Sequence, residues 1–284
     1  MELGFFERAL LEAVLAGGVA GLVGTFVVLR RRAFFTTALT HATFPGAVVA
    51  AVLGVSVVLG SAVFSLLLVA LMTAISRVRE QGAQVAAGVV LTFGFALGAL
   101  LQSANPSLPI SVESYLVGSI LTVGWGEITL TAVMFAVAAL VIATRGRHLV
   151  FSTVDELGYR AAGYRPWVAE ATIVALIAGT VVVIMPAIGA ILAIALIVGP
   201  AVAARQLVSS TNAVLVLAPL LGAASAVIGV IASRELSIAA GGAITVVIAA
   251  VVGIAVVIGR MLPSRRTGTV RPQPSATPRT LVGS

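Results

Sequence analysis

The sequence predicts an all-α membrane protein of about nine transmembrane helices. Three observations support this prediction. Hydrophobic residues make up 60% of the 284 positions and charged residues only 10%, whereas a soluble domain carries about 25% charged residues. Apolar runs recur at the length of about 20 residues that crosses a bilayer as a helix. The basic residues, all of them arginine, cluster at the ends of these runs.

The apolar runs define the expected helices in order along the chain. The second and third runs, and the sixth and seventh, are separated by very little. The nine segments are expected at roughly 9–29, 33–53, 56–76, 84–102, 127–144, 168–186, 187–204, 211–232 and 236–259.

The distribution of arginine predicts the orientation. With the N-terminus outside and the C-terminus in the cytoplasm, only Arg8 and Arg234 lie outside, and the other 15 of the 17 arginines face inward. This bias is the positive-inside pattern of a multispan protein. The net charge of +7 therefore indicates a lipid bilayer and no nucleic-acid partner. Residues 1–262 form the transmembrane domain, and 263–284, rich in Pro, Ser, Thr and Arg, form a disordered cytoplasmic tail.

Two loops are long enough to carry structure of their own. The outer one, about 103–126, contains "YLVGSIL", which is too short to span and is expected as a half-helix at or dipping into the outer surface. The inner one, about 145–167, contains "STVDE", a typical helix start. A short cytoplasmic helix is expected over 153–162, with Ser152 or Thr153 as its N-cap and Gly163 at its end.

The stretch "TTALTHATFPG" places an imidazole inside the second segment. Thr37, His41 and Pro45 are spaced four apart and share one helix face. Pro45 lacks an N–H group, so the carbonyl of His41 loses its helical donor. With the hydroxyl of Thr40, these groups form a polar patch at membrane depth, and an imidazole suits Zn, Fe, Mn or Ni. A histidine bonded to threonine, beside a proline kink used for packing, is the alternative interpretation.

Pro200 is expected to break a further helix near its cytoplasmic end, as a packing feature or a gate hinge. The chain has no cysteine and a single aspartate, Asp155, in the inner loop. Glu12 and Glu170 lie near segment ends, where they could reach the interface. The sequence carries no phosphate-binding loop, no nucleophile elbow and no paired carboxylates within a span. The chain is therefore not expected to be an enzyme, and a partner must supply the energy for any transport.

At these residues the chain resembles the permease subunits of ABC importers for manganese, zinc or iron(II). The resemblance rests on five blocks in order over residues 17–247: "GGVAGLVGTFVVLRRRAFFTTALTHATFPGAVVA", "SYLVGSIL", "VDELGYRAAG", "IGAILAIALIVGPAVAARQL" and, more weakly, "SRELSIAAGGAITVV".

The resemblance implies a dimer of permeases in a bacterial plasma membrane, two cytoplasmic ATPases and an outer metal-binding protein. It makes the segment at about 150–165, with Asp155, Glu156 and Gly163, the helix that docks into an ATPase. It assigns metal passage to His41 and implies no permanently bound cofactor, only a transported ion.

Two departures from the family pattern keep alternatives open. Thr37 stands where the family usually has Asp, and Ser237 and Ala239 replace the expected Asp and Pro of the fifth block, where Ser233 and Gly241 remain. Either metal passes with fewer charges, through a pair of dimer-related His41 side chains, or the cargo differs. The alternatives are an ABC permease for a metal chelate of siderophore or cobalamin type, and a self-contained secondary cation carrier.

Overall fold

The structure is a computed structural model that describes residues 4–76, 83–106 and 112–261, and all its regular elements in these ranges are helices. The predicted tail lies outside the described residues. The described helices include nine candidate membrane spans, which confirms the predicted number. The spans are α1 (Phe5–Leu29), α2 (Ala33–Ala42) with α3 (Phe44–Val52), α4 (Val57–Ser76), α5 (Ala83–Ser103), α7 (Trp125–Val154), α9 (Pro166–Ile188), α10 (Ala190–Leu207), α11 (Thr211–Leu236) and α12 (Ala240–Met261).

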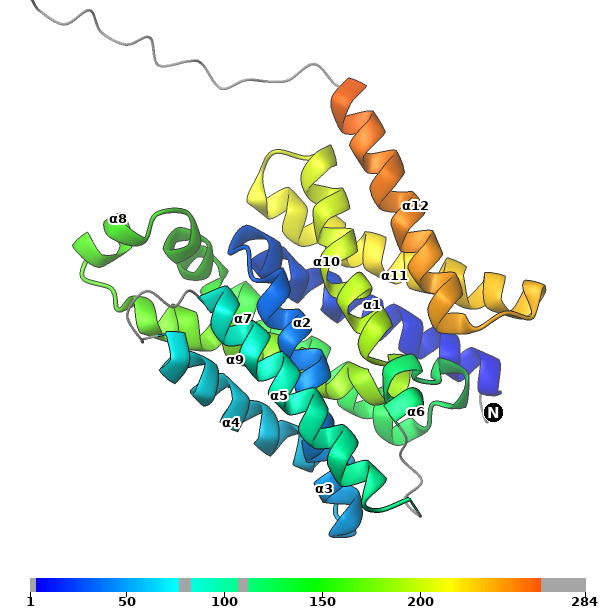
Figure 1. The fold of residues 1–284 in the computed structure, drawn as a ribbon. Helices are drawn as coiled ribbons and strands as arrows, with labels where there is room; N and C mark the ends of the chain where they lie inside the picture. Colours follow the sequence, from blue (N-terminus) through cyan, green and yellow to red (C-terminus); the bar gives the residue numbers. More distant parts are fainter. Residues whose placement is uncertain (1–3, 77–82, 107–111, 262–284) are drawn as a thin grey trace, which may run out of the picture.

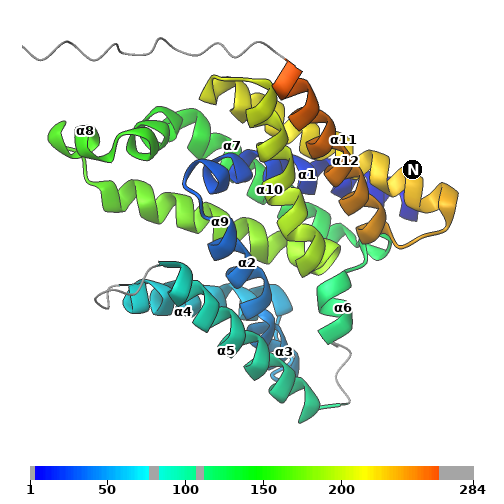
Figure 2. The ribbon, with the colours of Figure 1, turned by 45° about the horizontal axis from the view of Figure 1, so that its top comes forward.

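The spans form two groups that share α2 and α9. Helix α1 lies at the centre of the larger group, where it packs against α7, α9, α10 and α11 (Figure 1). Helices α2 to α5 pack on one another, and Figure 2 shows α3, α4 and α5 set off from the remaining helices. In its most apolar stretch α1 is 78% buried, against 22% for α12. Helix α1 is therefore the core of the fold.

Glycine lets α1 approach its neighbours at backbone distance. Gly17 faces the backbone of Gly222 on α11, and Gly24 faces the carbonyl of Ile197 on α10. Lipid tails are as apolar as the side chains, so packing of small residues is a main source of helix association in a membrane. The glycine-rich pattern of the first segment is thus explained by packing.

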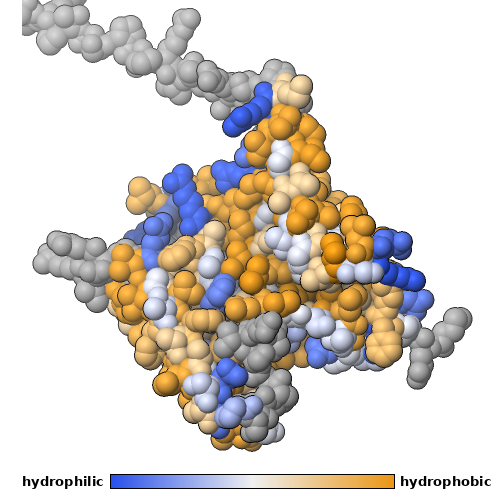
Figure 3. Space-filling view, turned by 45° about the vertical axis from the view of Figure 1, so that its right-hand side comes forward, coloured by the Kyte–Doolittle hydropathy of each residue, from blue (hydrophilic) through white to orange (hydrophobic). Residues whose placement is uncertain are grey.

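The outer surface of the bundle is apolar. Hydrophobic residues cover the middle of the face in Figure 3, and hydrophilic residues gather toward its margins. The large exposed side chains come from several spans and include Leu66 of α4, Leu140 of α7 and Val246 of α12. A soluble protein rarely exposes apolar patches of this extent, so this surface fits lipid contact.

Helix α7 is longer than its apolar run predicted. The expected segment ended at residue 144, and the helix continues to Val154, 30 residues in all. At 1.5 Å per residue this is about 45 Å, more than a bilayer core of about 30 Å. Arg145 and Arg147 end the apolar run, but the helix continues through both of them. The backbone hydrogen bonds of a helix form within the helix itself, so they do not require an apolar surrounding.

The connection from α9 to α10 is a single glycine. Gly189 has φ +78° and lies against Gly118 (φ +66°), which follows the short helix α6 (Val112–Val117). A Cβ on either glycine would lie less than 3 Å from the other segment's backbone. The one-turn 3-10 helix η1 (Ile120–Thr122) follows. A short helix forms in this loop as predicted, but it covers Val112–Val117 and ends before Gly118, within the predicted "YLVGSIL". The residues that follow it pack against the turn between α9 and α10.

Candidate functional site

The second span is interrupted where the sequence predicted. Helix α2 ends at Ala42, Thr43 follows, and α3 begins at Phe44 with Pro45 in its first turn. The N–H of Thr43 still donates to the Leu39 carbonyl at 3.2 Å. Pro45 has no N–H with which to reach the carbonyl of His41. The break therefore leaves a backbone acceptor beside the imidazole.

The His41 ring is held on one side and free on the other. It is half-buried, and its Nδ1 atom lies 3.1 Å from the Thr37 carbonyl oxygen and 3.2 Å from Thr40 Oγ1. The Thr40 hydroxyl donates to the same carbonyl at 2.8 Å, so both groups present lone pairs to Nδ1. Nδ1 is then the protonated nitrogen of the neutral ring. Nε2 keeps its lone pair and has no hydrogen bond among the described residues.

This arrangement matches the way that metal-ligating histidines are oriented. Such a histidine almost always donates its second ring N–H to a carbonyl, carboxylate or water, which sets the tautomer and the ring plane. The edge of the Phe95 ring, with centroids 6.4 Å apart, adds an apolar wall. The geometry makes His41 Nε2 a candidate ligand for a metal ion.

Thr37 contributes its carbonyl rather than its side chain. The Thr37 hydroxyl donates to the Ala33 carbonyl at 3.0 Å within the helix. The described residues contain no group of three or more His, Cys, Asp or Glu side chains that could hold a metal. At this break the described residues thus offer one imidazole, that of His41, together with backbone carbonyls.

The segment that contains α6 meets the helix break through Tyr115, which sequence reasoning did not single out. The Tyr115 hydroxyl lies 2.8 Å from Thr43 Oγ1, and its ring is 4.8 Å from that of Phe44. Burial raises the pKa of the Tyr115 phenol to about 12, so the group is a neutral hydrogen-bonding partner. The residues are 72 positions apart, and no local spacing could have paired them.

The second predicted break is absent. Helix α10 runs from Ala190 to Leu207 through Pro200 without interruption. The Pro200 ring is buried and lies close to Gly222 of α11. The prediction of a broken helix at Pro200 was therefore wrong, because packing against α11 holds the helix together across the missing hydrogen bond.

The loop between α7 and α9 forms the expected helix but with a different cap. Helix α8 covers Glu156–Ala161, and the Asp155 carboxylate accepts from the Gly158 N–H at 2.8 Å. Ser152 and Thr153 are in the last turn of α7, so their prediction as N-caps was wrong. Gly163 (φ +82°) ends the helix as predicted: its N–H and that of Tyr164 return to carbonyls of α8, as in a Schellman motif.

Helix α8 exposes one large apolar side chain, that of Leu157. Leu157 is 81% exposed, and Trp167, at the start of α9, is 65% exposed. An ion pair within α8, between Arg160 and Glu156 at 2.6 Å, is also exposed. A short capped helix with an uncovered leucine is suited to insertion into a partner's groove.

We expect Asp155→Ala to loosen α8 without unfolding the protein. Loss of an N-cap costs about 1 kcal/mol, so amide exchange over Glu156–Ala161 should become about fivefold faster. Hydrogen exchange measured by mass spectrometry tests this. Asp155→Asn keeps a capping oxygen and should exchange like the wild type. Equal rates in the Asn and Ala variants would contradict the role of the cap.

Glu12 differs from its expected position at an interface. Its side chain is fully buried in α1, and Thr131 of α7 donates to its Oε1 atom at 2.8 Å. The Oε2 atom has no hydrogen-bond partner among the described residues. The prediction that Glu12 reaches the interface was wrong because α7 packs over this part of α1.

Nine apolar spans among the described residues, one of them broken between α2 and α3, with the short capped helix α8 outside the bundle, form a multispan membrane protein. The chain belongs to the ABC 3 transport family, whose model matches residues 2–259.

Characterised relatives cover nearly the whole chain. The "Zinc transport system membrane protein TroC" of Treponema pallidum is 32% identical over 91% of this chain and 89% of its own length. The "Manganese transport system membrane protein MntC" of Halalkalibacterium halodurans is 28% identical over 86% of this chain and 83% of its own. A solved structure of PsaBC from Streptococcus pneumoniae in complex with Fab covers 89% of this chain and 91% of its own, at 28% identity and a TM-score of 0.82.

Proposed function

We propose that this chain is the membrane-spanning subunit of an ATP-driven importer for a divalent transition metal, manganese, zinc or iron(II), in a bacterial plasma membrane. The observation that carries the proposal is His41, with Nδ1 held by a carbonyl and Nε2 free at the break between α2 and α3. An imidazole selects these metals over magnesium or calcium. The names of the zinc and manganese relatives support the same cargo class.

Two copies of the chain form the pathway in this proposal. A single His41 is a poor site for a metal that takes four or more ligands, and Thr37 supplies no carboxylate. A second copy of the chain adds a symmetry-related imidazole, which is a neutral ligand. The metal ion is cargo, delivered by an extracytoplasmic binding protein, and it keeps some of its water.

Energy comes from cytoplasmic ATPase subunits that dock at α8. The exposed Leu157 and the well-capped ends of α8 support this assignment. The positive-inside pattern supports an outer N-terminus, which puts α8 and the C-terminus in the cytoplasm. With this orientation α6 lies on the side of the binding protein.

Dependence on an ATPase tests the proposal. The chain, reconstituted in liposomes with the ATPase and binding protein of its own genome, should take up Mn²⁺ or Zn²⁺ only with ATP. The chain alone should take up neither ion. Uptake by the chain alone under an ion gradient would instead establish a secondary carrier. Uptake of a siderophore or cobalamin complex, but not of the free ions, would establish a chelate permease.

A further inference from the structure

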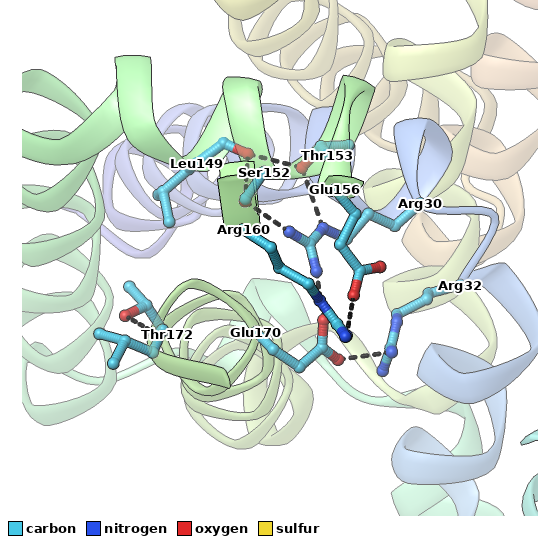
Figure 4. Close-up of polar contacts among 10 residues, drawn as sticks. Arg30, Arg32, Leu149, Ser152, Thr153, Glu156, Arg160, Glu170 and Thr172 are labelled. Atoms are coloured by element: carbon cyan, nitrogen blue, oxygen red, sulfur yellow. Dashed lines mark hydrogen bonds and ion pairs between the residues drawn. The ribbon is translucent and has the colours of Figure 1, made fainter. Parts of the chain in front are cut away.

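The junction between α1 and α2 is bonded to two other helices, α7 and α9. Figure 4 shows Arg30 reaching into the space between the end of α7 and the start of α9. Its Nε donates to Thr153 Oγ1 at 2.9 Å and its Nη2 to Ser152 Oγ at 2.8 Å, both in the last turn of α7. Its Nη1 pairs with Glu170 of α9. The other oxygen of Glu170 pairs with Arg32.

Arg30 is well enclosed. Its side chain is 13% exposed, against 31% for Arg32 and 34% for Glu170. Burial lowers the pKa of the Arg30 guanidinium from its usual value, and the neighbouring carboxylate of Glu170 opposes this shift. The guanidinium remains charged in any case. Its planar fork meets three acceptors on two helices at once, a geometry that a lysine ammonium on a flexible stem does not reproduce.

The backbone on both sides of this cluster is tight. Ser152 and Thr153 are separated from α8 only by Val154 and the cap Asp155. On the other side the chain turns from α1 into α2 through Arg31, at φ +55°, a conformation that favours glycine. The N–H groups of Arg31 and Arg32 close this turn on carbonyls of α1. Only two residues therefore separate α8 from the side chains that bind Arg30. Arg32, two residues after Arg30, is the N-cap of α2.

We propose that Arg30 is a positioning residue that transmits displacement of α8 to α2, the helix that ends beside His41. This rests on the proposed function, in which α8 is the ATPase contact. Glu170 is the second residue of this connection, which we call the joint. Its two carboxylate oxygens bind Arg30 and Arg32, the first and last residues between α1 and α2. The cluster ties the helix that receives force to the helix that carries the cargo ligand.

Transport per ATP hydrolysed tests the proposal. Arg30→Lys keeps the charge but not the three bonds. In the reconstituted complex it should hydrolyse ATP at close to the wild-type rate while taking up about tenfold less Mn²⁺ per ATP. Arg31→Lys is the matched control, since Arg31 is exposed and its side chain has no hydrogen bond or ion pair with the described residues; it should behave like the wild type. An unchanged ratio in Arg30→Lys, whether both rates stay or both fall together, would overturn the proposal.

A second experiment measures the distance between α8 and α2 in the absence of metal and ATPase. The chain has no cysteine, so spin labels at Leu157→Cys on α8 and Phe34→Cys on α2 report one distance when labelled chains are diluted with unlabelled ones. Both positions are exposed. We expect a narrow distance distribution in the wild type and in Arg31→Lys, and a broad one in Arg30→Lys. A narrow distance distribution in Arg30→Lys would refute the proposed coupling of α8 to α2 by Arg30. A broad distribution in Arg30→Lys, found together with a wild-type complex that takes up no metal, would refute only the proposed function.

Discussion

His41→Ala is expected to reduce metal uptake by the reconstituted complex on the order of 10–100-fold, the loss typical of weakening a metal's ligand sphere. The variant should still fold and assemble, because the ring is half-buried and, among the described residues, its hydrogen bonds are to its own helix and its aromatic contact is with Phe95. ATP hydrolysis should persist, since α8 and the Arg30 cluster are untouched. Uptake of radioactive Mn²⁺ or Zn²⁺ into liposomes measures the effect.

The expected loss follows from the state of the ring. The Thr37 carbonyl and Thr40 hydroxyl select the tautomer with hydrogen on Nδ1, so the free Nε2 lone pair is available to a cation. No other histidine replaces it, because His148, the second in the chain, packs against Tyr164 beside α8. His148→Ala is therefore the control, with uptake expected at the wild-type level.

A reciprocal variant tests the missing carboxylate. Thr37→Asp adds a charged oxygen ligand one helical turn from His41 and should increase affinity for Zn²⁺ or Mn²⁺, read as a larger thermal stabilisation at a given metal concentration. The gain should vanish in the double variant with His41→Ala. Full, selective uptake by His41→Ala would show that the pathway does not use this side chain.

Gly24→Ala is expected to destabilise the protein by about 3 kcal/mol. A methyl group at this position would lie 1.8 Å from the carbonyl oxygen of Ile197, which is backbone of α10 and cannot rotate away. The two helices must separate, and every contact along their crossing weakens. Because α1 is the centre of the bundle, we expect a thermal unfolding midpoint in detergent about 10 °C below that of the wild type.

The same substitution at an open position should have the opposite sign. Gly253 lies within α12, and a Cβ there has no atom within 4 Å. Gly253→Ala should therefore stabilise the protein by about 0.5–1 kcal/mol, because alanine favours the helix over glycine. Similar midpoints for the two variants would show that α1 and α10 do not approach as closely as described.

Much of the fold was predictable from composition. A chain with nine apolar runs has little choice in a bilayer, because only a helix satisfies its own backbone there. The interruption at Pro45 was also local, since one missing N–H affects the carbonyl four residues earlier. Pro200 shows where this reasoning fails: the same chemistry occurs in α10, yet packing on α11 keeps that helix continuous.

The candidate site likewise has features that the sequence predicted and features that it did not. The grouping of Thr37, Thr40 and His41 follows from helical spacing and was predictable. The contact of Tyr115 with Thr43 and the burial of Glu12 by α7 join residues 72 and 119 positions apart. Nothing in the local pattern encodes such partners.

The sequence by itself determined the class of protein, the number of spans and the polar patch around His41. These depend on transfer from water to lipid and on hydrogen bonds within one helix, both of which act over a few residues. Only the tertiary structure decided that Arg30 joins α7 and α9 to the start of α2, and that Tyr115 meets Thr43 at the helix break. Those outcomes depend on which helix faces meet and how side chains rotate, and they are set by packing across the whole bundle.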